Sequence, residues 1–109
     1  MTVAEVSKTL SLDIISSGDD ERELSGVYIG DLLSWVMGRA EENCAWITIM
    51  SNVNVVAVAS LADVACVILA EGVTLPDDVR ETASQKGINV FSSKKTAYEL
   101  AIALSELIK

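Results

Sequence analysis

The stretch Ser92-Ser93-Lys94-Lys95-Thr96 carries the side chains best suited to holding an anion. Lys94 and Lys95 form the one adjacent basic pair in the chain, and hydroxyl residues flank them on both sides. Ammonium and hydroxyl donors beside the start of a helix are typical of phosphate-binding loops. The pattern predicts a site for a phosphate-bearing ligand. The alternative is a solvated loop that only caps the helix after it.

Other residues give little support for catalysis. The chain has no histidine, so it lacks Ser-His-Asp and Cys-His pairs. It also lacks the G-x-x-x-x-G-K-[ST] string that cradles nucleotide phosphates and the G-x-G-x-x-G fingerprint. We therefore predict a protein that is not an enzyme and that uses no cofactor.

Metal binding is equally poorly supported. The densest set of oxygen ligands is Asp19, Asp20, Glu21 and Glu23, but Arg22 lies among them and the spacing fits no calcium loop. This stretch reads as a solvated acidic loop, and we predict no metal site.

The two cysteines, Cys44 and Cys66, are far apart and form no C-x-x-C pair. Cys66 lies in an apolar run and is predicted to be a buried thiol. Cys44, close to Trp46, is predicted to be partly exposed. We expect reduced thiols in a cytoplasmic protein, because the first ten residues do not have the pattern of a signal peptide.

Cap signals and apolar periodicity divide the chain into alternating helices and strands. Capping-box patterns start at Thr2 and Thr96, and Asn52 or Asn54 is the predicted cap of a central helix. A strand over residues 53–59 is the alternative there, because β-branched residues are dense. The predicted helices cover residues 3–9, 31–40, 55–62, 76–86 and 97–108, and the predicted strands cover residues 10–15, 45–50, 65–69 and 88–91.

This alternation predicts an α/β fold in which helices pack on a mostly parallel sheet of about four strands. The chain of 109 residues, half of them hydrophobic, is the size of a single domain spanning residues 1–109. Ligands of such folds bind beyond the carboxyl ends of the strands. That edge is predicted to hold the loops 16–20, 51–54, 71–74 and 92–96. The predicted ligand-binding residues are Ser51, Asn52, Asn54, Gly72, Ser92, Ser93, Lys94 and Thr96.

The net charge of −8 argues against binding to nucleic acid or to anionic lipid. The apolar stretch from Val53 to Ala70 is interrupted by Asn54, Ser60 and Asp63. A membrane-spanning helix needs roughly 20 apolar residues. We therefore expect a buried helix and strand here, with no membrane span.

The two tryptophans have different expected roles. Trp46 lies in a predicted strand and is expected in the core. Trp35 falls on the polar side of its predicted helix, which makes it a candidate residue for a protein interface.

The order of these segments resembles the DRTGG domain family. The resemblance rests on the stretches "SGVYIGDLLSWVM", "AWITIMSNVNVVAVASLADVACVILAEG" and "PDDVRETASQKGINVFSSKKTAYELAIAL", and it covers about residues 3–107. DRTGG domains accompany CBS domains and some inorganic pyrophosphatases, and they are related to the N-terminal domain of HPr kinase/phosphorylase. The resemblance implies an α/β fold, frequent dimers and a regulatory role. It gives no support for an HPr serine kinase, because the P-loop is absent.

The residues that give the family its name have changed in this chain. An alignment by eye places the Asp-Arg pair at Asn52 and Val53, and the Thr-Gly-Gly group at Ala70, Glu71 and Gly72. Gly72 alone is retained. This difference predicts that an anionic ligand of the family would bind poorly here, or that a different ligand binds.

Together these observations predict a stand-alone, non-catalytic module that regulates or senses a small ligand and acts as a homodimer. The expected ligand is a nucleotide or another small anion. The alternative is a protein–protein interaction or assembly module whose ligand pocket has degenerated, with Trp35 at the contact with a protein partner.

Overall fold

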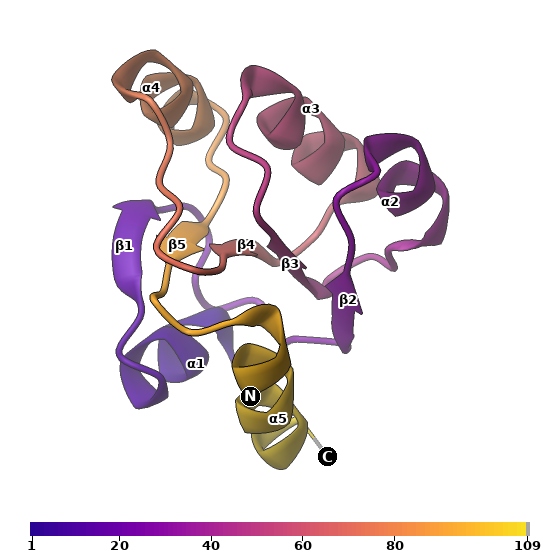
Figure 1. Cartoon of the computed structure of the whole chain (residues 1–109), viewed down its shortest axis with the longest axis vertical. Coiled ribbons are helices and arrows are strands. Elements are labelled where there is room, and N and C mark those ends of the chain that lie inside the picture. The colour runs from indigo at the N-terminus through magenta and orange to yellow at the C-terminus, as the bar shows by residue number, and fades with distance from the viewer. Residues whose placement is uncertain (109) are drawn as a thin grey trace.

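A sheet with the strand order β1-β5-β4-β3-β2 runs through the part of the chain that the computed structural model describes, residues 1–108 (Figure 1). β1 is antiparallel to β5, and the other neighbouring strands are parallel. The mostly parallel α/β sheet is therefore confirmed, with five strands in residues 1–108 where four were expected. The strands are β1 (Asp13–Ser16), β2 (Val27–Ile29), β3 (Ala45–Thr48), β4 (Cys66–Leu69) and β5 (Val90–Ser92).

Helices cover both faces of this sheet. α2, α3 and α4 pack on one face, and α1 and α5 pack on the other (Figure 1). Each layer encloses its own apolar core, so the domain has the three-layer arrangement of doubly covered α/β folds. The helices are α1 (Val3–Thr9), α2 (Leu33–Arg39), α3 (Val53–Ala62), α4 (Asp77–Gln85) and α5 (Ala97–Leu107).

The central strands β3 and β4 are buried on both faces. All their residues are buried, with Trp46 and Leu69 in the core under α2–α4 and Ile47 and Ile68 in the core under α1 and α5. A strand covered on both faces is mostly apolar, which explains the hydrophobic runs, and the polar Thr48 at the end of β3 donates its hydroxyl to the Asp31 carboxylate. The predicted burial of Trp46 is confirmed.

The helix starts follow the predicted cap signals. The Thr2 and Thr96 side chains accept hydrogen bonds from the backbone N–H groups of Glu5 and Glu99, and both glutamates bond back to the cap residues. These hydrogen bonds lower the pKa of both carboxyl groups. Asn52 caps α3, so the alternative strand over residues 53–59 is wrong.

The stretch from Val53 to Ala70 divides into α3 and β4, as predicted. None of the helices in residues 1–108 has the length and apolar character that a membrane crossing requires.

Two strand predictions were inaccurate. β1 begins at Asp13 rather than at residue 10, because Leu10 ends α1 and Ser11 adopts a left-handed conformation with φ of 52°. β2 was not predicted at all. Its residues Val27, Tyr28 and Ile29 favour strands, but three residues are too few to show an alternating pattern.

The apolar face of α2 is narrower than the hydrophobic residues at positions 32, 33, 36 and 37 indicate. Val36 is buried and Leu33 is half-buried, but Leu32 and Met37 are exposed. The helix starts at Leu33, because the Asp31 side chain bonds to the β3–α3 loop instead of capping α2.

The buried side chain of Asn89 ties three segments together at the amino edge of the parallel strands. Its Oδ1 accepts a hydrogen bond from the Gly18 N–H over 2.7 Å, and its Nδ2 donates to the carbonyl groups of Asp19 and Ala65. Gly18 approaches the backbone of Gly87 so closely that a Cβ atom would lie 1.9 Å from the Gly87 oxygen. This contact holds the loop after β1 against the turn before β5.

We predict that Gly18→Ala lowers the free energy of unfolding by about 2–4 kcal/mol, because the added methyl group must displace backbone atoms. Chemical denaturation monitored by circular dichroism measures this loss. Gly38→Ala is the matched control, because its Cβ meets nothing within 4 Å and α2 should gain about 0.5 kcal/mol. Equal stabilities for the two variants would contradict the close approach at Gly18.

Candidate functional site

The carboxyl edge of the sheet collects the loops after β2, β3, β4 and β5. The predicted fourth loop, residues 16–20, lies at the opposite edge, because β1 runs antiparallel to β5. That prediction is corrected. The reversed strand instead brings its beginning to the carboxyl edge, where Asp13 pairs in register with Ser92.

The loop after β3 is held by structural hydrogen bonds. The Asp31 carboxylate accepts bonds from the Thr48 hydroxyl over 2.7 Å and from the Ile49 N–H over 3.0 Å. The Asn52 side chain accepts from the Asn54 N–H over 3.0 Å. Asn52 therefore serves the start of α3. Asp31 was missed by the sequence analysis, which assigned it to the start of a helix.

The loops after β4 and β5 are clasped together by their backbones. The N–H groups of Glu71 and Gly72 donate to the carbonyl groups of Lys95 and Ser93, each over 2.8 Å. The Ser92 hydroxyl donates to the Val73 carbonyl over 2.7 Å. We call this set of contacts the loop clasp. It fixes the backbone of residues 93–95 beside the start of α5.

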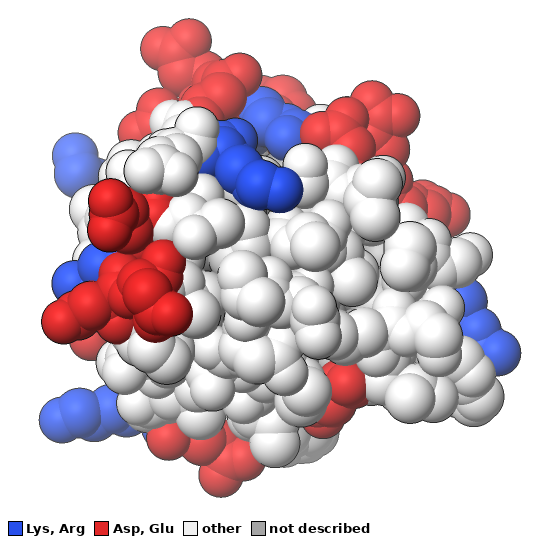
Figure 2. All heavy atoms as spheres, turned by 90° about the horizontal axis from the view of Figure 1, so that it is seen from above, with Lys and Arg blue, Asp and Glu red and all other residues white. Residues whose placement is uncertain are grey.

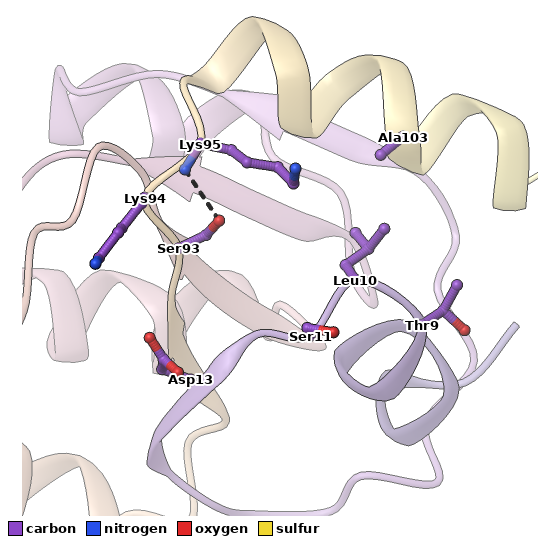
Figure 3. Close-up of a pocket in the computed structure, with 8 residues that line it drawn as sticks. All are labelled: Thr9, Leu10, Ser11, Asp13, Ser93, Lys94, Lys95 and Ala103. Atoms are coloured by element: carbon purple, nitrogen blue, oxygen red, sulfur yellow. Dashed lines mark hydrogen bonds between the residues drawn. The ribbon is translucent and has the colours of Figure 1, made fainter.

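A pocket of about 580 Å³ opens next to the loop clasp (Figure 3). One wall comes from α1 and the start of β1, and the other from the β5–α5 loop and α5. The Lys95 side chain extends over the pocket toward Leu10 and Ala103, whereas Lys94 points in the other direction (Figure 3). The lining residues are Thr9, Leu10, Ser11 and Asp13 on the first wall and Ser93, Lys94, Lys95 and Ala103 on the second.

Of the predicted ligand-binding residues, Ser93 and Lys94 line this pocket. Ser92 is buried and its hydroxyl belongs to the loop clasp. The Gly72 N–H also belongs to the clasp, where it donates to the Ser93 carbonyl. Thr96 caps α5. Ser51, Asn52 and Asn54 lie farther along the edge, at the start of α3.

The pocket also contains residues that the predicted set left out. Asp13 and Ser11 were missed because the direction of β1 is not encoded in its local pattern. Lys95 carried a usable signal, as the neighbour of Lys94 in the basic pair.

Neither cysteine is suited to act as a nucleophile. Both are buried, which corrects the predicted partial exposure of Cys44 and confirms the predicted burial of Cys66. Burial raises the pKa of Cys44 to about 11 and that of Cys66 to about 12. Almost no thiolate therefore exists near neutral pH, and thiolate is the reactive form.

Arg22 anchors the acidic loop to the turns before β3 and β4. The Arg22 guanidinium donates to the carbonyl groups of Asp63 and Val64 and to the Asn43 side chain, and it pairs with the Asp63 carboxylate over 3.1 Å. Across residues 1–108, no group of three or more His, Cys, Asp or Glu side chains is arranged to hold a metal ion.

An uncharged surface lies over α2 and α3. α3 contains no charged residue, and its side chains Val53 and Leu61 are exposed, Leu61 by 72%. Trp35 on α2 is 52% exposed, with the Arg39 guanidinium 3.7 Å from its ring centroid. Figure 2, which views the α2–α4 side, shows a broad white area with most of the charged groups at its margin. We call the exposed side chains of Trp35, Val53 and Leu61 the uncharged face, which the Arg39 guanidinium borders at Trp35.

Comparison with known protein families finds a match to the DRTGG domain over residues 5–107. The chain belongs to the DRTGG domain family. The resemblance inferred from the sequence is thereby confirmed over nearly the whole length. A comparison with curated protein sequences finds no match.

Among solved structures, this DRTGG domain is similar to the CBS and DRTGG domains of the regulatory region of Clostridium perfringens pyrophosphatase, which was solved with its activator diadenosine tetraphosphate. The TM-score is 0.71 at 16% sequence identity. The match covers 98% of this chain but 45% of the other, so this chain spans less than half of that regulatory region. At this identity the match establishes a shared fold.

The loop clasp contains Glu71 and Gly72, which stand at the second and third positions of the Thr-Gly-Gly group of the DRTGG domain. Glu71 adopts φ of 57° and Gly72 φ of 77°, both in the left-handed region. Glycine enters this region without steric cost, whereas a side chain with a Cβ is strained there by roughly 1 kcal/mol. The backbone shape explains why a glycine would suit position 71.

We predict that Glu71→Gly raises the free energy of unfolding by about 1 kcal/mol, because it relieves the strain while keeping the N–H that bonds to Lys95. Thermal or urea denaturation measures the change. Glu71→Ala removes the same charge but keeps the Cβ, so it should stay within about 0.5 kcal/mol of the parent. If both variants gain equally, charge rather than backbone strain is responsible.

Proposed function

We propose that this DRTGG domain is a non-catalytic regulatory module that senses a small ligand. The pocket beside the loop clasp is the observation that carries this proposal. Its walls come from the first thirteen residues and from residues 93–103, so an occupant would join segments from opposite ends of the sequence. A ligand that bridges two such segments stabilises the state in which they lie together.

Family membership supports the regulatory role. The pyrophosphatase region with the same fold is regulatory and was solved with a nucleotide activator. A sensing role also requires no reactive group, and the chain has no histidine, no P-loop and two thiols with raised pKa. We further propose a cytoplasmic location, in which both buried thiols stay reduced.

A thermal-shift screen of metabolites tests the sensing role. A ligand present at about 100 times its dissociation constant adds about 2.7 kcal/mol of stability. We expect at least one compound of a panel that includes neutral, cationic and anionic metabolites to raise Tm by several degrees. A control screen on Gly18→Ala tests whether the shift survives a change far from the pocket. If no compound in the panel shifts Tm, ligand sensing is contradicted.

An interaction module is the second candidate, and the uncharged face favours it. Each copy carries a net charge of −8, so two copies repel each other over most of their surfaces. Val53, Leu61 and Trp35 provide apolar area without that repulsion. We propose that a homodimer, or a contact with a protein partner, forms through this face.

We predict that Trp35→Ala shifts the chain from dimer toward monomer in analytical ultracentrifugation, because a large aromatic group leaves the proposed contact. Tyr98→Ala is the matched control. Tyr98 is a more exposed aromatic residue, at 74%, but lies on α5 on the other side of the sheet. A dimer that dissociates equally in both variants, or in neither, would place the interface elsewhere.

A further inference from the structure

We propose that the pocket between α1, β1 and α5 binds a phosphate ester that also carries hydroxyl groups, with Lys95 as the anchor for the phosphate. This inference rests on the proposed sensing function. It adds the chemical class of the ligand and the residue that selects it.

The backbone of Lys95 is fixed by hydrogen bonds, whereas its ammonium group forms no ion pair with the other described residues. Its N–H donates to the Ser93 hydroxyl over 3.2 Å, and its carbonyl accepts from the Glu71 N–H over 2.8 Å. The ion pairs of residues 1–108 involve the Met1 amine with Glu23 and Arg22 with Asp63, so the Lys95 ammonium takes part in neither. These two bonds fix the backbone from which the Lys95 side chain extends over the pocket, and the ammonium group is available to pair with a phosphate.

Hydroxyl groups from both walls add to the anion site. The Ser93 oxygen accepts the Lys95 N–H, which leaves its own proton free to donate. On the opposite wall, the hydroxyls of Thr9 and Ser11 form no hydrogen bond with other groups in the described part of the chain. These groups can donate to phosphate oxygens or pair with ligand hydroxyls.

Asp13 makes the pocket electrically asymmetric. Its carboxylate lies on the side away from the tip of Lys95, with Ser93 between them (Figure 3). A carboxylate repels a second anionic group and accepts hydrogen bonds from hydroxyls. A ligand that fits this arrangement has a phosphate at the Lys95 end and hydroxyls at the Asp13 end. Sugar phosphates and nucleoside monophosphates share that chemistry, and the pocket of about 580 Å³ is within the usual range for small ligands.

Isothermal titration calorimetry at fixed ionic strength tests the proposal on the full chain. The probes are ribose 5-phosphate, AMP, adenosine and inorganic phosphate. We expect saturable binding of at least one phosphate ester, with an affinity of about 1 mM or tighter, and weaker binding of adenosine and of phosphate alone. Comparison of ribose 5-phosphate with AMP shows whether the base contributes.

Variants assign the role of each group. Lys95→Gln should weaken binding of the ester by about 10-fold or more, because a charge-assisted hydrogen bond is lost, and Lys95→Arg should retain most of it. Lys86→Gln, an exposed lysine at the end of α4, is the control and should bind normally. Asp13→Asn should raise the affinity for inorganic phosphate more than the affinity for the ester.

Three results would overturn the proposal. The first is that neither ester binds. The second is that Lys95→Gln binds the ester with unchanged affinity. The third is that Lys86→Gln loses as much affinity for the ester as Lys95→Gln does. A neutral metabolite that stabilises the domain while the esters do not would preserve ligand sensing and reject the phosphate anchor. Failure of both the esters and the wider metabolite panel would instead reject the sensing function itself.

Discussion

The loop clasp is the contact on which the rest of the proposed site depends. The backbone N–H groups of Glu71 and Gly72 hold the carbonyl groups of Lys95 and Ser93. This pairing requires two consecutive residues in the left-handed region, which is why a glycine follows β4 and why Glu71 is strained. Together with the bond from the Ser93 N–H to the Leu69 carbonyl, the clasp fixes the backbone of residues 93–95, from which the Lys95 side chain extends over the pocket.

Because helices cover both faces of the sheet, polar side chains that could bind a ligand lie at its edges. β3 and β4 are buried on both faces, so their interiors accept only apolar groups. Polar side chains are therefore found at the two edges of the sheet. At the amino edge Asn89 and Arg22 close the structure with internal hydrogen bonds. At the carboxyl edge Lys95 and Asp13 remain available, which makes that edge the better candidate for ligand binding.

Much of the fold could be predicted because its signals are local. The capping boxes at Thr2 and Thr96 marked helix starts, and the apolar run ending at Leu69 marked a doubly buried strand. The β2 strand was missed because three residues are too few to show a period. The site was predicted less completely, because its first wall depends on β1 running antiparallel to β5. That direction is set by long-range contacts such as the one between Gly18 and Asn89.

The central claim is that a ligand occupies the pocket formed by α1, β1 and α5. Backbone amide chemical-shift mapping by NMR, during titration with ribose 5-phosphate or AMP, tests it most directly. A ligand bound in this pocket gives its largest chemical-shift changes in residues 9–13 and 93–103, which form the two walls. Shifts concentrated in residues 51–54, at the start of α3, would contradict binding in this pocket.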